Sequence, residues 1–276
     1  MRIKASVAVV TGGSSGIGRA VALALARRGA RVALVARDAA RLQQVAGEIE
    51  AAGGAALVVP CDVASAAEVE EAFAEIERRL GPPDILVNAA GSAVWKPFLE
   101  VAVEDHRRMM DTNYWGTFHT VRAVLPGMLR RRRGSLVNIS AGSGKFALAI
   151  TNGFSASKFA VAGLSQSLRR ELAGTGVKVS CMFPGSVRTP FWNDAAIATS
   201  RLPPIVRFAP KLSPAAAARQ VCWAIRFALA ERTFPLFVGF LARANALWVR
   251  LGDFLLWRWA LPVVAAVVAL RYLLGQ

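Results

Sequence analysis

The chain carries, near its start, a glycine-rich stretch of the kind that binds phosphates. Residues 11–18 read Thr-Gly-Gly-Ser-Ser-Gly-Ile-Gly and lie between a short apolar run, Val7–Val10, and a segment with helical spacing, Arg19–Arg28. Glycines at a strand-to-helix turn let the backbone approach a pyrophosphate, and the helix N-terminus favours its negative charge. The pattern predicts a dinucleotide site, with a tight structural turn as the alternative. Its predicted residues are Gly12, Ser14, Ser15, Gly16, Ile17 and Gly18.

A basic residue follows the second predicted strand, Arg31–Ala36. An acidic residue at this strand end would bind the ribose hydroxyls of NAD. Ala36 removes that acid, and Arg37 supplies a planar cation suited to a phosphate. The sequence therefore predicts NADP(H) as the cofactor, with a solvated Arg37 that merely leads the next helix as the alternative.

Short apolar runs alternate with helical segments of about ten residues or more, which predicts a parallel sheet covered on both faces. The fold class is therefore α/β, a single Rossmann-type doubly wound sheet over residues 1–233, with an apolar, basic helical extension over residues 234–276. The predicted strands are residues 7–10, 31–36, 57–60, 85–87, 135–139 and 177–182. The predicted helices are residues 19–28, 39–52, 68–80, 105–129 (interrupted by Pro126) and 158–172.

Six motifs in order resemble those of the short-chain dehydrogenase/reductase superfamily, from Arg2 to about Pro190. They are Thr11–Gly18, Asp62-Val63, Asn88-Ala89-Ala90-Gly91, Asn113, Leu136–Ser140 and Pro184–Thr189. The resemblance implies an NADP(H)-dependent oxidoreductase that interconverts a carbonyl and an alcohol. It also implies contacts to the adenine, the central sheet, the ribose and the nicotinamide. The residues concerned are Asp62, Val63, Asn88, Ala89, Gly91, Lys158, Pro184, Gly185, Val187 and Thr189.

The same resemblance implies a mechanism in which a tyrosine exchanges a proton with the substrate oxygen. A free tyrosine has a pKa near ~10, and a lysine cation one helical turn later lowers it. A serine orients the substrate oxygen, and an asparagine holds a water in the proton relay. Asn113 and Lys158 match this pattern, but Phe154 stands at the tyrosine position and Ala141 at the serine position.

Neither replacement carries a hydroxyl group. Ser140 is one residue from the serine position, and one step along a strand turns a side chain to the other face, so Ser140 is a poor substitute. Losing a positioned general acid typically costs about 10²–10⁴ in rate. Two functions therefore stay open. One is an oxidoreductase that is impaired or draws its proton from another group or from water; the other is a non-catalytic NADPH-binding scaffold or sensor.

The last quarter of the chain is both apolar and basic. The chain has a net charge of +16, and residues 201–276 hold ten lysines and arginines against two acids, a net charge of +8. The uncharged run Trp259–Leu270 is shorter than the roughly twenty residues of a membrane span. We predict an in-plane or shallow membrane anchor, with Trp248, Trp257 and Trp259 near the headgroups. A true membrane span and a soluble homo-oligomer interface are the alternatives for this segment. The alternative explanation of its positive charge is an arginine-rich composition throughout the chain.

Residues 191–212 follow the last motif and are apolar and proline-containing. In the family, this segment covers the substrate. Its apolar composition here therefore implies a lipophilic small molecule as the substrate. A surface loop packed on the domain is the alternative.

Other classes of partner receive little support from the sequence. The run Arg130–Arg133 follows a predicted helix, whose carbonyl end attracts cations, so we expect no nucleic acid. His106 and His119 have no metal-ligand spacing, so we expect no metal. The three cysteines lack C-x-x-C spacing and Met1–Lys4 leads straight into a strand, which predicts a cytoplasmic location.

Overall fold

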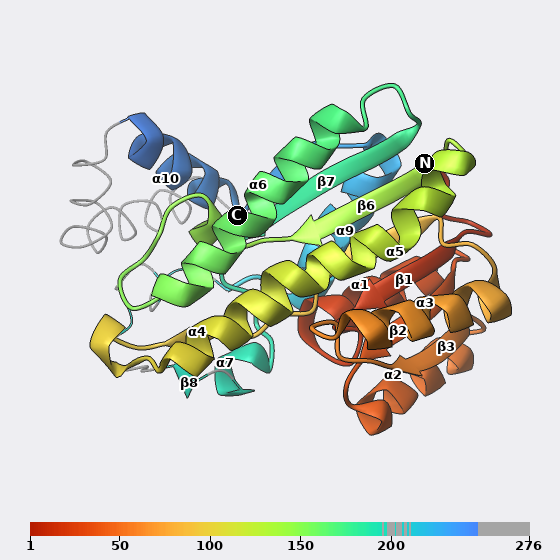
Figure 1. Cartoon of the computed structure of the whole chain (residues 1–276), viewed down its shortest axis with the longest axis horizontal. Helices are drawn as coiled ribbons and strands as arrows, with labels where there is room; N and C mark the ends of the chain where they lie inside the picture. The colour runs from red at the N-terminus through yellow and green to blue at the C-terminus, as the bar shows by residue number, and fades with distance from the viewer. Residues whose placement is uncertain (195, 198–201, 203–205, 207–208, 210, 248–276) are drawn as a thin grey trace, which may run out of the picture.

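The computed structural model of the chain describes residues 1–194, 196–197, 202, 206, 209 and 211–247. Within them, seven parallel strands form one sheet (Figure 1). From one edge to the other they are β3 (Ala55–Pro60), β2 (Arg31–Ala36), β1 (Val7–Thr11), β4 (Ile85–Asn88), β6 (Gly134–Ile139), β7 (Val177–Pro184) and β9 (Glu231–Phe234). The predicted Rossmann-type doubly wound sheet is confirmed.

Helices cover both faces of this sheet (Figure 1). One face carries α1 (Gly16–Ala26), α2 (Ala39–Ala51) and α9 (Pro214–Phe227), and the other carries α3 (Ala66–Leu80), α5 (Gly116–Arg130) and α6 (Asn152–Glu171). The remaining elements are β5 (Val94–Trp95), η1 (Phe98–Glu100), α4 (Val103–Met110), η2 (Asp111–Trp115), η3 (Gly142–Gly144), α7 (Phe191–Asp194), β8 (Ala196–Ile197) and α10 (Leu236–Leu247). β5 pairs with β8 in a separate two-stranded sheet.

Burial on both faces explains why the strands are continuous apolar runs. Ala8 and Val10 of β1 belong to the core under α1, α2 and α9. Val7 and Val9, which alternate with them, belong to the core under α3 and α5. A central parallel strand has no solvent face, so no alternation with polar residues is seen.

Two helices differ from the sequence prediction. The segment predicted as one helix over residues 105–129 is divided into α4, a π-helical turn η2 and α5, and α5 continues through Pro126 instead of breaking there. The helix predicted to begin at Lys158 begins at Asn152. Phe154 and Lys158 are therefore one turn apart on the same helix, α6.

The strand β9 was not predicted, because Glu231, Arg232 and Thr233 give it no apolar run. Among the strands that the structure describes, it pairs only with β7, and an edge strand can carry polar residues. The predicted boundary after residue 233 falls inside this strand. Of the predicted extension, the structure describes residues 234–247; Trp248, Trp257, Trp259 and the rest of the proposed anchor lie outside the described residues.

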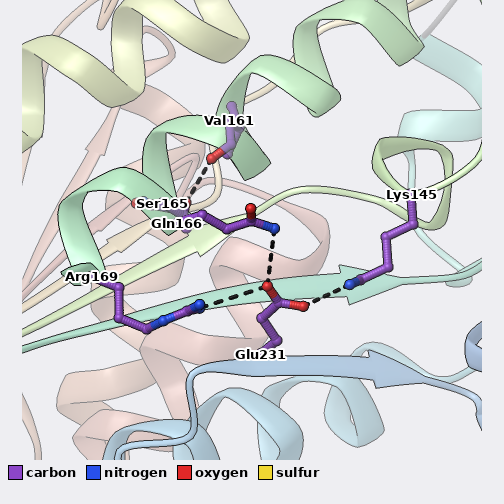
Figure 2. Close-up of polar contacts among 7 residues, drawn as sticks. Lys145, Val161, Ser165, Gln166, Arg169 and Glu231 are labelled. Atoms are coloured by element: carbon purple, nitrogen blue, oxygen red, sulfur yellow. Dashed lines mark hydrogen bonds and ion pairs between the residues drawn. The ribbon is translucent and has the colours of Figure 1, made fainter.

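Glu231 binds β9 to α6 and to the segment after β6 (Figure 2). Its carboxylate accepts hydrogen bonds from Lys145 Nζ at 2.6 Å and Gln166 Nε2 at 3.2 Å, and lies 3.6 Å from Arg169 Nη1. Burial raises the pKa of Glu231, but the bonds and charges of these partners outweigh it and hold the pKa below its ordinary value. The network thereby joins the segment after β6 and the helix α6 to the sheet edge.

A buried chain of polar side chains joins the centre of the sheet to two helices. Thr120 Oγ1 of α5 donates to Asn88 Oδ1 at 2.8 Å, and Asn88 Nδ2 donates to Asn138 Oδ1 at 3.0 Å. Asn138 Nδ2 donates in turn to Ser165 Oγ of α6 at 2.9 Å. These bonds satisfy the buried amides and fix β4, β6, α5 and α6 relative to one another.

The arginine run at the end of α5 contacts neighbouring loops. Arg131 Nη2 donates to the carbonyl of Pro83, and Arg132 Nη2 donates to the carbonyl of Gly174. Arg133 Nε lies 3.4 Å from a carboxylate oxygen of Asp84. These three cations thus have partners within the chain.

Candidate functional site

A cavity of about 900 Å³ follows the carboxyl ends of the parallel strands. Its walls come from the residues that follow β1, β2, β3, β4, β6 and β7, and from one face of α10. The carboxyl edge of an open parallel sheet is where such proteins bind ligands. Every predicted cofactor residue lines this cavity except Asn88, whose amide lies in the buried polar chain.

The glycine-rich turn is shaped for close backbone approach. Gly12 and Gly16 have φ of +65° and +54°, in the left-handed region. A Cβ on Gly18 would lie 2.1 Å from the carbonyl oxygen of Gly12, so a side chain there would displace the turn. Ser15 precedes α1 without a side-chain capping bond. The amides of the first turn of α1 therefore remain available to a phosphate.

Two arginines lie at the end of the cavity beside β2 and β3. Arg37 Nη1 is 3.8 Å from Asp62 Oδ2, and the Arg37 side chain is 75% exposed. Arg41 also lines the cavity, and its Nε lies 3.3 Å from Asp38 Oδ2. Arg41 was not predicted as a site residue, because it falls at a regular helical position of α2. A cofactor phosphate bound at this end of the cavity would meet two arginine cations, and each of them already lies beside a carboxylate.

Lys158 lies buried in the middle of the cavity wall. Its side chain is 6% exposed, and its Nζ donates to the carbonyl of Ile139 at 3.0 Å. The Nζ also lies 5.8 Å from the centroid of the Phe154 ring. Burial lowers the pKa of Lys158 to about 8. The ammonium therefore faces a phenyl ring, where the family pattern would have a phenol.

The serine hydroxyls nearest to Ala141 in the sequence belong to Ser140 and Ser143. Ala141 lines the cavity with a methyl group, and the hydroxyl of Ser140 donates to the backbone carbonyl of Lys158 at 2.8 Å. That bond directs Ser140 toward α6. Ser143 also lines the cavity and is buried, but it lies in the short helix η3 after Ala141.

Asn113 supports the site from behind its wall. It lies in the π-helical turn η2 and is 1% exposed. Its Nδ2 donates to the carbonyl of Ser92 and to Ser157 Oγ, and its Oδ1 accepts from the backbone N–H of Ser92. Asn113 therefore fixes the segment that follows Gly91, and it is not among the residues that line the cavity.

The rest of the cavity is aromatic and apolar. The Phe154 ring lies 5.6 Å from Trp95 and 5.9 Å from Phe191, measured between ring centroids, and Trp95 meets Trp192 edge-on at 5.4 Å. Further apolar lining residues include Ala93, Val94, Phe146, Leu148, Val206, Ala209, Phe237, Val238 and Leu241. Such a wall suits a lipophilic molecule.

Several of these residues were missed by the sequence analysis. Trp95 could have been found, because it follows Gly91 by only four residues. No recognised motif lies close in sequence to Phe237, Val238 and Leu241, because only the turn after β9 brings α10 to the cavity.

The parallel sheet, the glycine turn and the cavity at its carboxyl edge define a dinucleotide-binding α/β protein. The family model of the short chain dehydrogenases matches residues 6–198, and the chain belongs to this oxidoreductase family.

Relatives and solved structures agree with that assignment. An uncharacterized oxidoreductase of Staphylococcus saprophyticus is 40% identical over 195 residues, which are 70% of this chain and 83% of that protein. A short chain dehydrogenase/reductase from Burkholderia phymatum in complex with NAD has a TM-score of 0.83 at 25% identity, covering 91% and 96% of the two chains. Actinorhodin polyketide ketoreductase with NADPH has a TM-score of 0.75 at 33% identity, covering 85% and 97%.

The buried ammonium of Lys158 predicts a specific dependence of stability on pH. Its pKa falls from an ordinary value of 10.5 to about 8 on folding. Between these values the unfolded chain binds more protons at this group than the folded chain, so its contribution to the free energy of unfolding rises with pH. We expect the wild type to gain stability relative to Lys158→Met between about pH 7 and about pH 9.5, in urea denaturation.

Lys178→Met is the control, because Lys178 is an exposed lysine of β7. The wild type should show no comparable gain relative to this variant. A constant difference between wild type and Lys158→Met across the same range would show that Lys158 keeps its ordinary pKa.

Proposed function

We propose that this chain binds NADP(H) beside a lipophilic carbonyl compound or alcohol, and that proton transfer at this site is impaired. The observation that carries the proposal is the buried Lys158 ammonium facing Phe154, with Ala141 on the same cavity wall. By lineage the chain is an oxidoreductase. The residues that bind are retained, and the two that would carry hydroxyl groups are replaced.

The residues present fit a dinucleotide. The glycine turn leaves no room for a Cβ at Gly18, and the amides at the start of α1 have no capping side chain. At the end of β7, the cavity is lined by Pro184, Gly185, Val187 and Thr189. When bound, the nicotinamide of such a cofactor supplies or accepts a hydride.

The side chains then determine what happens to the proton. When the carbon of a carbonyl group gains a hydride, its oxygen needs a proton, which a positioned acid normally supplies. Lys158 can hold a hydroxyl group of the cofactor ribose, and its lowered pKa keeps part of it neutral near pH 8. Phe154 has no proton to give, and the hydroxyl of Ser140 is engaged by the backbone of Lys158. Any turnover must draw its proton from water or from another group.

The same two residues favour a second function, a non-catalytic protein that senses or carries NADPH. Phe154 packs against Trp95 and Phe191, so the phenyl ring is part of an aromatic wall. A cavity that binds both ligands without reacting would serve such a role.

Restoring the two hydroxyl groups should restore turnover. We expect the Ala141→Ser/Phe154→Tyr double variant to oxidise NADPH with acetophenone or a long-chain aldehyde about 10²–10⁴ times faster than the original chain. The rate of NADPH loss measures this directly. Phe159→Tyr is the matched control, because it adds a phenol at an exposed position of the same helix.

Each outcome separates the two functions. Turnover in the double variant alone supports an impaired reductase. Comparable turnover in the original chain would show that the proton comes from elsewhere. No turnover in either chain, with NADPH still bound, would favour the non-catalytic function.

We also propose that Arg37 selects NADP(H) over NAD(H). Arg37→Ala should weaken NADPH binding about tenfold, through loss of a charge-assisted hydrogen bond to the phosphate, and should leave NADH binding nearly unchanged. Calorimetric titration of both cofactors measures the difference. Arg78→Ala, at an exposed position of α3 outside the cavity lining, is the control. Equal losses for NADPH and NADH would remove this role from Arg37.

We further propose that the C-terminal segment binds a membrane surface. Within α10, Leu236, Phe240 and Leu247 are 88%, 61% and 81% exposed, while Val238 and Leu241 are buried. The sequence beyond is apolar, basic and rich in tryptophan. In the described part of the chain, no helix is long and apolar enough to cross a bilayer. Exposed apolar side chains with a basic continuation suit an anionic lipid surface.

Truncation after Leu247 tests this proposal without removing the cavity wall that α10 forms. The truncated chain should lose co-sedimentation with vesicles of phosphatidylcholine and phosphatidylserine, while its NADPH affinity stays unchanged. Binding of the full chain should weaken as salt rises. Equal co-sedimentation of both chains would contradict membrane binding through residues 248–276.

A further inference from the structure

Two buried polar atoms in the cavity wall have no partner. Among the described residues, the buried side-chain nitrogens and oxygens that form no hydrogen bond are Trp95 Nε1 and Ser92 Oγ. Both residues line the cavity, and Trp95 is 5% exposed. Leaving a buried donor unpaired is unfavourable, so such groups usually have a partner when the site is filled.

The scaffold holds both donors in place. Trp95 belongs to β5, whose backbone pairs with β8, and its ring contacts Phe154 and Trp192. The backbone of Ser92 is held on both sides by the amide of Asn113. The hydroxyl of Ser92 takes no part in those bonds. The backbone positions of both donors are therefore fixed.

The neighbouring Trp192 shows that an indole N–H can find a protein acceptor in this part of the cavity wall. Trp192 Nε1 donates to the carbonyl of Val187 at 2.8 Å. Trp95 also contacts Phe154, whose phenyl ring carries no nitrogen or oxygen to accept a hydrogen bond. The indole with the unpaired donor thus contacts the ring that occupies the proton-donor position of the family.

We propose that Trp95 Nε1–H, with Ser92 Oγ as a second donor, binds the oxygen of the lipophilic ligand. This inference rests on the proposed function and names the residues that recognise the oxygen. An indole N–H is a donor only and does not release its proton near neutral pH. Trp95 therefore orients a carbonyl or hydroxyl oxygen without protonating it. Binding is retained in this way while turnover stays slow.

Two probes of the same shape separate oxygen recognition from packing. Acetophenone carries a carbonyl oxygen, and α-methylstyrene carries a methylene group at the same position. With the full chain saturated by NADPH, we expect Trp95→Phe to weaken acetophenone binding roughly 2- to 10-fold and to change α-methylstyrene binding less than about twofold. Ser92→Ala should act in the same direction and leaves the bonds to Asn113 intact.

The indole N–H signal of Trp95 in nitrogen-15 NMR gives a second readout. It is assigned by its absence in Trp95→Phe, and it should move downfield with acetophenone and not with α-methylstyrene. Trp192→Phe is the matched control, because its N–H is already bonded to Val187. That variant should affect both probes equally.

Three results would overturn the proposal. They are equal losses for the two probes in Trp95→Phe, an unmoved Trp95 signal when acetophenone is bound, and no saturable binding of acetophenone. Failure of the proposed function is distinguishable, because it shows as an inactive Ala141→Ser/Phe154→Tyr variant that still binds acetophenone through Trp95.

Discussion

The hydrogen bond between Asn88 and Asn138, 3.0 Å long and buried, joins the two central strands from which the reactive part of the site extends. β4 leads from Asn88 to Gly91, Ser92 and Trp95, and β6 leads from Asn138 to Ala141. Thr120 and Ser165 extend the same bonds to α5 and α6, so the helix that carries Phe154 and Lys158 is held against both strands. A buried amide that lost one partner would remain unsatisfied, so the arrangement tolerates little change.

Around this frame the cavity has the features that we propose bind the cofactor, and we propose that it lacks an efficient proton donor. The buried ammonium of Lys158 stays, as do the glycine turn and the open amides of α1. At the positions where the family pattern has hydroxyl groups, the chain has a methyl and a phenyl group. The phenyl ring is built into an aromatic wall with Trp95 and Phe191, which makes it a packed component of the cavity. Membrane association through the C-terminal segment, which we propose separately, would bring such a cavity close to lipophilic ligands.

The sequence predicted those parts whose signal is local. Strands buried on both faces are continuous apolar runs, and the glycine turn needs its glycines for steric reasons visible in the spacing. β9 was missed because an edge strand needs no apolar run. It is held by pairing with β7 and by the contacts of Glu231 with Lys145, Gln166 and Arg169. The walls formed by α10 and the unpaired donor of Trp95 depend on segments far apart in the chain. No periodicity within either segment encodes such contacts.

The central claim is that the cavity binds cofactor and carbonyl ligand together without an efficient proton donor. The most direct measurement follows NADPH fluorescence as the full chain is added, and then follows NADPH absorbance after acetophenone is added to the saturated complex. The account predicts saturable enhancement of the fluorescence, followed by little or no loss of absorbance. Rapid loss of NADPH from this complex, or no binding of NADPH at all, would contradict it.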